Sequence, residues 1–406
     1  MKPPPRVGLV GVSGYSRVHL QHLLEFHTRQ ELRLAAVVAV NRPEEAETCR
    51  RLEALGCRVF DRFDELQRVL PAGSLDLCVI PSPIHHHAAM SIAALEAGRH
   101  VLVEKPVAAT VAEAQAIAAA AARSGRTAAV GFQYLHAPEV QALRRRLVAG
   151  RIGELRSLKV HAAWPRGRHY YTRNDWVGRL RTPAGAWVLD SPVNNAMAHF
   201  FMLMLFLAAP EGGRVARPAA LTAELYRAQP IESFDTAVLH LQTESGCRLS
   251  FYGTHSSREL GTPRLELTGT RGRGEWVQDC HAWLDTPEGR WHEDARPEAH
   301  TRECMLRDVL ARVRGEPEAF VCTPEMALEH TRCVNALHAG GVIVEVPSPA
   351  RTPELRDGDS FTYVAGLDEA LRLAFDRESS LAEAGLPWAV RPMDVVLGDD
   401  GLFRPA

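Results

Sequence analysis

Near its beginning the chain reads VGLVGVSGYS over residues 7–16, and this stretch decides how the first part of the sequence folds. The apolar residues 7–10 are typical of a short buried strand. A turn with Gly11 and Gly14 follows, and helical spacing begins at Tyr15. A strand, a tight glycine turn and a helix in this order predict the first unit of a parallel α/β sheet.

The same alternation continues along the chain. Further apolar strands are expected at residues 34–40, 75–80 and 101–103, with helices such as 88–97 and 107–124 between them. Strands that are almost continuously apolar are buried on both faces, which is typical of a doubly wound parallel sheet. The fold class is therefore α/β, and we expect an N-terminal Rossmann domain over residues 1–130.

The pattern then changes to that of a second domain. Residues 237–241 and 264–267 alternate between apolar and polar side chains, which predicts half-exposed antiparallel strands. Helices are expected at 194–207 and 303–314. We expect an α+β domain with a large open, mostly antiparallel sheet over residues 131–346. Two acidic residues in this part, Asp235 and Asp279, are expected at the surface or in turns.

Residues 347–406 form a C-terminal extension. The polar, Pro-rich residues 347–360 predict a linker or surface loop, and residues 367–375 predict a short amphipathic helix. If one face of the large sheet stays apolar and uncovered, a second copy of the chain would cover it. The sequence therefore predicts a homodimer or homotetramer.

The composition excludes several classes of function. The 406 residues carry a formal net charge of −2 and show no basic stripe, which argues against nucleic acid or an anionic membrane as the main partner. The longest apolar run, 200–209, is too short to cross a bilayer. Eight cysteines without a Cys-x-x-Cys pair, behind an N-terminus without a signal-peptide pattern, predict reduced thiols in a cytoplasmic protein.

Lysine is rare in this chain, and one lysine stands at an informative place. Of the 47 Lys and Arg residues only Lys2, Lys105 and Lys159 are lysine. Lys105 follows the strand at 101–103, at the sheet edge where open α/β folds bind ligands. An ammonium in a dry pocket can lose its proton, whereas a guanidinium stays charged. An ordinary surface lysine at a strand end is the alternative interpretation.

The first turn departs from the dinucleotide fingerprint Gly-x-Gly-x-x-Gly. Ser13 and Ser16 occupy the second and third glycine positions after Gly11. Small residues here, with Gly14 and the helix start at Tyr15, still allow backbone amides to surround a pyrophosphate. A purely structural turn remains an alternative.

The strand at 34–40 ends at Asn41 and Arg42. An NAD enzyme usually offers a carboxylate to the adenosine ribose at this point. Asn41 would not repel a 2′-phosphate, and Arg42 can pair with one, so the sequence favours NADP as the cofactor. Arg42 as a solvated loop residue is the competing interpretation.

Three adjacent histidines, His85 to His87, raise the question of a metal site. Three consecutive side chains on a strand or helix do not face one point, and no carboxylate is close in sequence. We therefore expect no metal, and a place for His87 near the cofactor edge instead.

An aromatic and basic cluster stands early in the second domain. It comprises Trp164, Arg166, His169, Tyr170 and Tyr171. Aromatic faces and arginines suit the recognition of a polyol or sugar acid. A loop packed over the sheet edge explains the cluster equally well.

Several motifs occur in a definite order. They are the Gly11 turn, Ser82-Pro83 with His87, the block ALEAGRHVLVEKP at 94–106, GFQY at 131–134, GRIG at 150–153, YYTRNDW at 170–176 and GAWVLD at 185–190. Together they resemble the glucose–fructose oxidoreductase, inositol dehydrogenase and rhizopine-catabolism family (Gfo/Idh/MocA), and the resemblance covers roughly residues 6–345. The block at 94–106 is its most specific part.

The resemblance implies a Rossmann domain followed by an α/β domain with an open sheet. It also implies oxidation or reduction of a carbinol on a sugar or cyclitol with NAD(P). Lys105 would touch both cofactor and substrate, with Glu104 and Pro106 setting its position and the Lys105–Pro106 peptide cis. The other cofactor contacts that it implies are Ser82, Pro83, His87 and Gln133. The expected substrate contacts are Trp164, Arg166, Tyr171, Trp176 and Asn194.

The sequence departs from the family pattern downstream. The usual Asp-x-Gly-x-His becomes Asp190-Ser191-Pro192-Val193-Asn194, so the histidine that often exchanges the proton is Asn194. An amide cannot exchange a proton near pH 7, although it can hold a hydroxyl. His199 lies five residues on, about 140° around a helix. Three readings stay open: Lys105 handles the proton alone, His199 substitutes, or the hydride chemistry is altered. The family's arginine after Gln-Tyr is also replaced, by Leu135.

The expected function is therefore an NAD(P)-dependent oxidoreductase acting on a CH–OH group of a sugar, sugar derivative or cyclitol. Lys105 would exchange the hydroxyl proton while Asp190 and Asn194 orient the sugar. One alternative is an enzyme of the same family that cleaves or eliminates at a glycosidic bond and recycles its cofactor. The other is a catalytically silent dinucleotide-binding sensor or scaffold.

Overall fold

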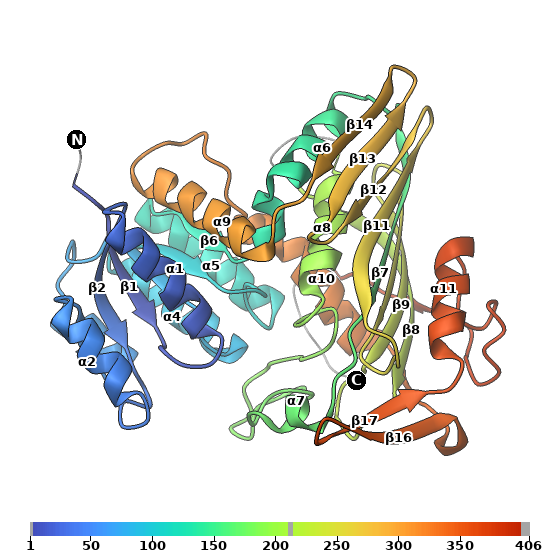
Figure 1. The fold of residues 1–406 in the computed structure, drawn as a ribbon, viewed down its shortest axis with the longest axis horizontal. Coiled ribbons are helices and arrows are strands. Elements are labelled where there is room, and N and C mark those ends of the chain that lie inside the picture. The colour runs from blue at the N-terminus through green and yellow to red at the C-terminus, as the bar shows by residue number, and fades with distance from the viewer. Residues whose placement is uncertain (1–2, 210–213, 399–406) are drawn as a thin grey trace. The chain divides into compact units, whose positions relative to one another are not determined.

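The computed structural model describes residues 3–209 and 214–398 (Figure 1). The chain forms two compact units. Residues 1–108, 112–136 and 302–328 make up unit 1. Residues 109–111, 137–301 and 329–406 make up unit 2. Residues 302–328 were expected in the second domain, but in the structure they belong to unit 1.

Unit 1 is built on a parallel sheet of six strands, in the order β3-β2-β1-β4-β5-β6. The strands are β1 (Arg6–Val10), β2 (Arg33–Val38), β3 (Arg58–Phe60), β4 (Leu77–Ile80), β5 (His100–Val103) and β6 (Ala128–Val130). The connecting helices are α1 (Ser16–Thr28), α2 (Ala46–Ala54), α3 (Phe63–Val69), α4 (His87–Glu96) and α5 (Val111–Ser124), with short 3-10 turns at Ile84–His86 and Gln133–His136. The order reverses between β1 and β4, and the predicted Rossmann-type α/β fold is confirmed.

Helix α9 (Glu298–Val313) completes the core of unit 1, although it comes late in the chain. Met305, Leu306, Val309 and Leu310 are buried in one cluster with side chains of β1, β2 and α1. This apolar face explains why residues 302–328 belong to unit 1. Packed against the first sheet, the helix buries apolar surface that it would otherwise expose to solvent.

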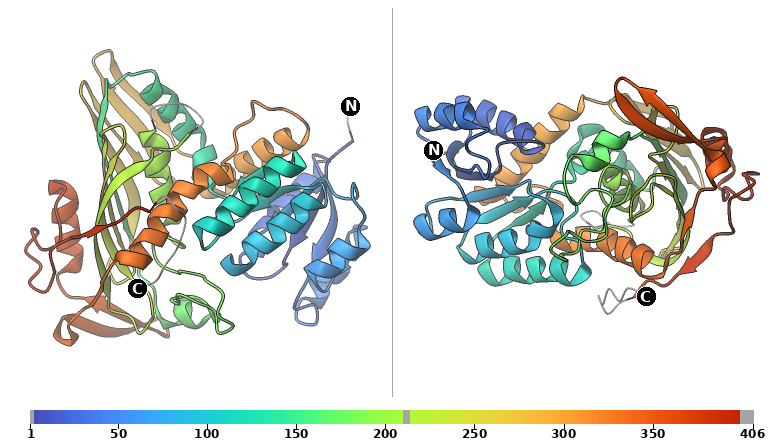
Figure 2. Two further views of the ribbon diagram at one scale, coloured as in Figure 1. Left: turned by 180° about the vertical axis from the view of Figure 1, so that it is seen from behind. Right: turned by 90° about the horizontal axis from the view of Figure 1, so that it is seen from below.

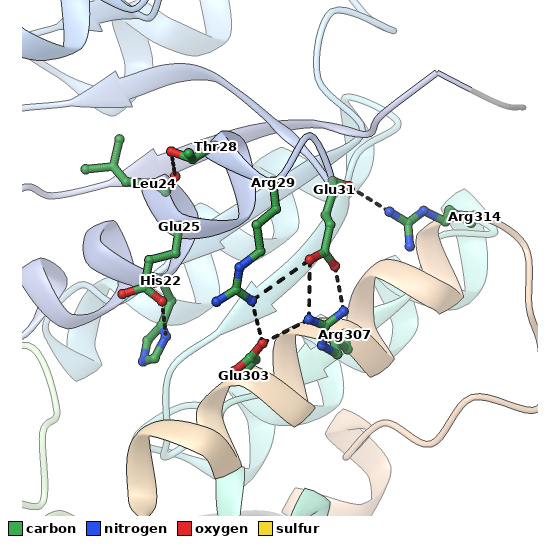
Figure 3. Close-up of polar contacts among 9 residues, drawn as sticks. All are labelled: His22, Leu24, Glu25, Thr28, Arg29, Glu31, Glu303, Arg307 and Arg314. Atoms are coloured by element: carbon green, nitrogen blue, oxygen red, sulfur yellow. Dashed lines mark hydrogen bonds and ion pairs between the residues drawn. The ribbon is translucent and has the colours of Figure 1, made fainter.

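A group of ion pairs borders the same contact, as Figure 3 shows. Glu303 accepts from Arg29 at 2.7 Å and from Arg307 at 2.9 Å. Arg307 also pairs with Glu31 at 2.6 Å, and Arg314 donates to the backbone oxygen of Glu31 at 2.6 Å. These charges lie at the edge of the apolar contact and fix the end of α1 and the loop after it to α9.

Unit 2 contains the predicted large sheet. Nine strands follow the order β14-β13-β12-β11-β7-β10-β9-β8-β15, and β18 pairs with β8 as the tenth. The pairs β7–β10 and β8–β15 are parallel and the others antiparallel, so the expected mostly antiparallel sheet is confirmed. The strands are β7 (Leu155–Ala163), β8 (Pro218–Arg227), β9 (Thr236–Thr243), β10 (Arg248–Thr254), β11 (Gly261–Gly269), β12 (Arg273–Val277), β13 (His281–Thr286), β14 (Gly289–Asp294), β15 (Ile343–Glu345) and β18 (Met393–Val395).

The remaining helices are α6 (Pro138–Val148), α7 (Arg168–Thr172), α8 (Ala198–Ala208), α10 (Pro324–Gly340) and α11 (Leu367–Arg377). Every side chain of α8 is buried, and the helix packs against β7 on one face of the large sheet. The helix expected at 194–207 begins only at Ala198, because residues 191–197 form successive turns.

The C-terminal extension contains more structure than the sequence indicated. A 3-10 turn at Ser348–Ala350 leads into a hairpin of β16 (Arg351–Arg356) and β17 (Asp359–Val364), where a linker or loop was expected. Its turn is Asp357-Gly358, with φ of 51° and 79°, a strong hairpin signal that the Pro-rich composition obscured.

Helix α11 covers part of the large sheet on the face opposite α8 (Figure 2). Leu367, Leu371 and Phe375 are buried against Tyr226 and Tyr252 of the sheet. The face that the sequence analysis expected to lie open is therefore partly covered by the chain's own extension. Within the described residues no helix is long and apolar enough to span a membrane.

We expect the contact between α9 and unit 1 to depend on its apolar side chains. Leu310→Ala should lower the free energy of unfolding by about 2–5 kcal/mol, since Leu310 is buried and leaves a cavity. Arg307→Gln should cost no more than about 1 kcal/mol, because its ion pairs are half exposed. Urea denaturation of both variants measures this, and equal losses would contradict it.

Candidate active site

The turn after β1 leaves room that only glycine provides. Gly11 has φ of +97°, and a Cβ there would lie 2.5 Å from the Ser16 Oγ. Its N–H donates to the Val38 oxygen at 2.8 Å, which ties the turn to β2. The turn therefore requires glycine at position 11, whereas a Cβ at Gly14 would meet no heavy atom within 4 Å. This tight turn with open space at the start of α1, the Gly11 cradle, fits a bound pyrophosphate. Gly14, also at positive φ, and Tyr15 are exposed.

The two serines of the turn point in different directions. Ser13 Oγ is 3.4 Å from the Asn41 Oδ1, across the space between the turn and the end of β2. Ser16 Oγ donates to the Pro81 oxygen at 3.4 Å, so it links α1 to the end of β4. The structure thus brings Ser13 and Asn41 together at the edge where the sequence placed the adenosine.

Arg42 already has two carboxylate partners. Its guanidinium lies 2.7 Å from Glu53 and 3.3 Å from Asp61, with 42% of the side chain exposed. A 2′-phosphate at this position would have to replace at least one of these carboxylates and would be repelled by the other.

Lys105 is positioned by the residue before it. Glu104 is buried at the end of β5; its Oε1 lies 2.9 Å from the His19 Nε2, and its Oε2 accepts the Lys105 N–H at 3.1 Å. A Cβ at Gly131 would come within 2.7 Å of the Glu104 Oε1. Lys105 itself is half-buried, and the Lys105–Pro106 peptide is cis, as the resemblance implied.

His19 is a participant that the sequence analysis missed. It lies on α1 and is 7% exposed, 85 residues before Glu104. In the sequence it stands among ordinary helical residues, and no spacing signal connects it with the Glu-Lys-Pro segment. Only the packing of α1 on the sheet reveals the pair.

His87 joins the ends of β4 and β5. Its Nε2 lies 2.7 Å from the Ser82 oxygen and its Nδ1 lies 2.7 Å from the Pro106 oxygen. Burial lowers the pKa of His87, and the ring is 1% exposed. Both ring nitrogens thus face backbone oxygens. Because a neutral imidazole has a single N–H, His87 donates to only one of them, and its ring packs between the end of β4 and the Lys105 turn. Among the described residues no group of His, Cys, Asp or Glu is arranged to hold a metal ion.

The remaining cofactor residues of the prediction lie near the same strand ends. Pro83 follows Ser82 in extended conformation, and Gln133 is 1% exposed in the 3-10 turn after β6. Unit 1 therefore gathers the predicted residues of its strands β1, β2, β4 and β5 at their carboxyl ends.

In unit 2, Asp190 is a buried carboxylate that holds its own loop. Its Oδ2 accepts the Gly178 N–H at 2.6 Å, and its Oδ1 accepts from the Asn195 Nδ2 at 2.8 Å. Only 3% of Asp190 is exposed. Asp190 therefore acts on residues 178 and 195 in the structure, and Asn195 is a second residue that the sequence analysis did not identify.

Asn194 uses its amide for the backbone. The Nδ2 donates to the Val188 oxygen at 3.2 Å and to the Leu189 oxygen at 3.0 Å. Leu189 has φ of +52°, a strained conformation for a branched side chain. Since Asn194 precedes α8, the offset of 140° to His199 expected for one continuous helix does not apply. His199 is the second residue of α8 and is 6% exposed.

The residues of the predicted aromatic and basic cluster lie close together in unit 2. The Arg166 guanidinium lies 4.7 Å from the ring centre of Tyr170 and 5.7 Å from that of Trp164. The Tyr170 and Tyr171 rings meet edge to face at 5.1 Å. Trp176 is half-buried, and its backbone N–H donates to the Asn174 Oδ1 at 3.2 Å.

His255 and Asp235 are buried close to this cluster. The His255 Nδ1 lies 2.8 Å from the Trp164 oxygen, and burial with help from Arg166 lowers the pKa of His255 to about 3. Asp235 was expected at the surface or in a turn. A surface position is wrong, because Asp235 is fully buried, and its Oδ2 accepts the N–H groups of Ala228 and Gln229 at 2.7 Å. Burial raises the pKa of Asp235, and these amides oppose the rise.

Comparison with protein-family models gives two matches. Residues 5–132 match the model described as the Gfo/Idh/MocA oxidoreductase family with an NAD-binding Rossmann fold. Residues 140–275 match the Gfo/Idh/MocA C-terminal domain.

Curated relatives include sugar and cyclitol enzymes. Inositol 2-dehydrogenase 1 of Saccharopolyspora erythraea is 29% identical over 66% of this chain and 72% of its own length. The dTDP-3,4-didehydro-2,6-dideoxy-alpha-D-glucose 3-reductase of Streptomyces violaceoruber is 30% identical over 38% of this chain and 44% of its own length. Glucose-6-phosphate 3-dehydrogenase of Bacillus subtilis is 28% identical, and the match spans 41% of its length. The chain thus spans less than half of the last two relatives.

Among solved structures, the fold resembles the WlbA dehydrogenase from Bordetella pertussis in complex with NADH and UDP-GlcNAcA. The TM-score is 0.66 at 21% identity, over 82% of this chain and 94% of that one. An aldose-aldose oxidoreductase from Caulobacter crescentus gives a TM-score of 0.66 at 18% identity, over 82% of this chain and 96% of that one.

The low pKa of His255 predicts how stability depends on pH. An unfolded histidine binds a proton near pH 6.5, whereas folded His255 resists protonation down to about pH 3. Its contribution is therefore fully present above pH 6.5 and is lost as the pH falls, by about 2 kcal/mol at pH 5.

Denaturation of the wild type and His255→Asn between pH 7 and pH 5 tests this; the amide keeps a donor for the Trp164 oxygen. Between pH 6 and pH 5 the wild type should lose about 1.2 kcal/mol more than the variant. Parallel pH profiles of the two proteins would contradict the assignment.

Proposed function

Because the chain belongs to the Gfo/Idh/MocA family of NAD-binding oxidoreductases, we propose that it oxidises or reduces a CH–OH group of a sugar, sugar derivative or cyclitol. In this proposal unit 1 holds the dinucleotide and unit 2 supplies the substrate contacts. The observation that carries it is the positioned Lys105 at the end of β5, held through Glu104 and His19 in the sheet that carries the Gly11 cradle.

When bound, the nicotinamide accepts or returns the hydride. Gly11, Ser13 and Gly14 would surround the pyrophosphate with backbone and hydroxyl groups, and Asn41 would face the adenosine. Ser82 and Pro83 would line the edge beside the nicotinamide. His87 would act as a positioning residue, because its Nδ1 lies against the Pro106 oxygen.

Lys105 would take the hydroxyl proton at its Nζ during oxidation and return it during reduction. The contacts of Asn194 agree with a proton carrier elsewhere: its amide donates to the oxygens of residues 188 and 189 and is neither an acid nor a base near pH 7. Asp190 would keep the loop at Gly178 in place.

Cofactor choice, location and assembly stay predictions. Arg42 favours NADP only if it exchanges Glu53 or Asp61 for the 2′-phosphate, so the preference over NAD should be modest. A cytoplasmic homodimer or homotetramer remains the expectation, with the part of the large sheet outside α11 as the surface for a second copy.

Replacing Lys105 by Met removes the ammonium and keeps the length of the side chain. Turnover on a substrate found in a sugar and cyclitol screen should fall by at least about 10²-fold, since general acid–base catalysis contributes at least that much. NADH affinity, followed by tryptophan-to-nicotinamide energy transfer, should change little.

Lys159→Met is the matched control, because Lys159 pairs with Glu266 on the large sheet and has no proposed catalytic part. Its turnover should equal that of the wild type. If Lys105→Met keeps turnover within a few-fold, the proposed mechanism is wrong. Product formation without any net change in nicotinamide absorbance would favour the cofactor-recycling class instead.

Arg42→Ala tests the cofactor prediction. If Arg42 reads a 2′-phosphate, the variant should bind NADPH about tenfold more weakly and NADH within about twofold of the wild type. Fluorescence titration with each dinucleotide measures both constants. A wild type that prefers NADH, or an equal loss for both cofactors, would show that the NADP prediction is wrong.

A further inference from the structure

A cavity of about 760 Å³ lies within unit 2, in the size range of small-molecule sites. Four segments line it: the turn of α7, residues 177–179, the loop 229–232 and strand β17. The last of these belongs to the C-terminal extension, outside both stretches that match the family models. Neither family model therefore describes this wall.

The hairpin wall is fixed to the other walls by specific contacts. The Asp359 Oδ1 accepts the His169 N–H at 3.0 Å, and a Cβ at Gly167 would collide with the Asp359 carboxylate. Gln229 Nε2 donates to the Thr362 oxygen at 3.1 Å. Strand β17 is thus held to α7 on one side and to the loop 229–232 on the other, so specific hydrogen bonds fix the walls of the cavity to one another.

The charges of the lining are unequal. Arg168 and Arg179 both line the cavity, with Glu232 as the acidic residue among them. Glu232 lies 3.8 Å from the Arg179 guanidinium and also accepts the Leu180 N–H at 3.0 Å. Within the described part of the chain, the Arg168 guanidinium makes no hydrogen bond or ion pair. The cavity therefore keeps one arginine whose fork of donors is available to a ligand.

The rest of the lining suits a sugar. Ser360 and Thr362 are two residues apart on β17, so their hydroxyls share one face of the strand and both line the cavity. The Tyr171 ring provides an apolar wall, next to Gly178, whose Cβ would lie 3.3 Å from the Tyr171 ring. Hydroxyl donors beside an aromatic face match the alternating polar and C–H surfaces of a sugar ring.

We propose that this cavity binds a sugar carrying an oxyanion, a phosphate or a carboxylate, with Arg168 pairing the anion and the β17 hydroxyls contacting the sugar. The proposal rests on the proposed function in taking the ligand to be a sugar. It narrows that function to acidic sugars, and it gives the C-terminal hairpin the role of completing the site.

The test is calorimetric titration of the full chain, with and without saturating NADH, using glucose 6-phosphate, glucuronate and glucose as probes. At least one anionic sugar should bind at least about tenfold more tightly than glucose, because a charge-assisted arginine contact contributes that much. Arg168→Gln should remove the difference, and the double variant Ser360→Ala, Thr362→Val should weaken binding a few-fold.

Arg356→Gln is the matched control, since Arg356 lies in the same hairpin at the surface and does not line the cavity. It should bind as the wild type does. Absence of anionic-sugar binding up to about 10 mM, equal affinity for glucose, or equal behaviour of the two arginine variants would overturn the proposal. An unchanged double variant would remove the hairpin from the site.

The two proposals fail separately. NADH binding without any preference for an acidic sugar leaves the dehydrogenase standing and overturns the oxyanion site. Anionic-sugar binding that depends on Arg168, in a protein that binds neither NADH nor NADPH, supports the site and overturns the dehydrogenase. Which probe binds also decides between phosphate and carboxylate as the anion.

Discussion

The buried carboxylate of Glu104 is the constraint on which the candidate site depends. It stands at the end of β5, where the ring of His19 from α1 and the N–H of Lys105 supply its hydrogen bonds at 2.9 Å and 3.1 Å. A side chain at Gly131, after β6, would collide with it. A carboxylate buried without such partners would cost several kcal/mol, roughly 3–5 when one partner is removed. Packing of α1, the end of β5 and the bare backbone at Gly131 must therefore all be correct before Lys105 takes its place.

Unit 2 contains two further buried carboxylates that accept hydrogen bonds from backbone N–H groups. Asp190 collects the N–H of Gly178, and Asp235 collects those of Ala228 and Gln229, each from within the fold. The two carboxylates thereby fix the loops that line the cavity beside α7. Because only a substitution by proline removes a backbone N–H, such loops keep their donors while the exposed side chains on them vary. The arginines and hydroxyls of the cavity are such side chains, so this frame allows the ligand to be changed without changing the fold.

The elements with strong local patterns were predictable from the sequence. Composition alone predicted the apolar strands β1, β4 and β5 and the turn at Gly11. The block at 94–106 carried the family resemblance. Two of the failures, the place of residues 302–328 and the part played by His19, have one cause: each depends on a partner distant in sequence. Residues 302–328 resemble part of the second domain in sequence, but in the structure Leu306 and Leu310 are buried in the core of unit 1. His19 is one helical histidine among several until Glu104 meets it, and Asp235 looks like a surface residue because its donors are backbone amides. The hairpin at 351–364 was hidden by prolines, although Asp357-Gly358 was the signal that could have found it.

The exchange of the family histidine for Asn194 follows the same logic of hydrogen bonds. The amide nitrogen has two hydrogens, and it gives one to the oxygen of Val188 and one to that of Leu189, whose backbone is strained at φ of +52°. A neutral imidazole carries a single N–H and could satisfy only one of these acceptors, so asparagine suits the turn better than histidine does. The consequence is chemical: the position no longer holds a proton that can move near pH 7. In the proposed reaction the proton would then need another carrier, and a chain that uses arginine almost everywhere has a lysine where the sheet ends, at Lys105. Arginine could not serve there, because its guanidinium does not release a proton at any pH at which the protein is folded.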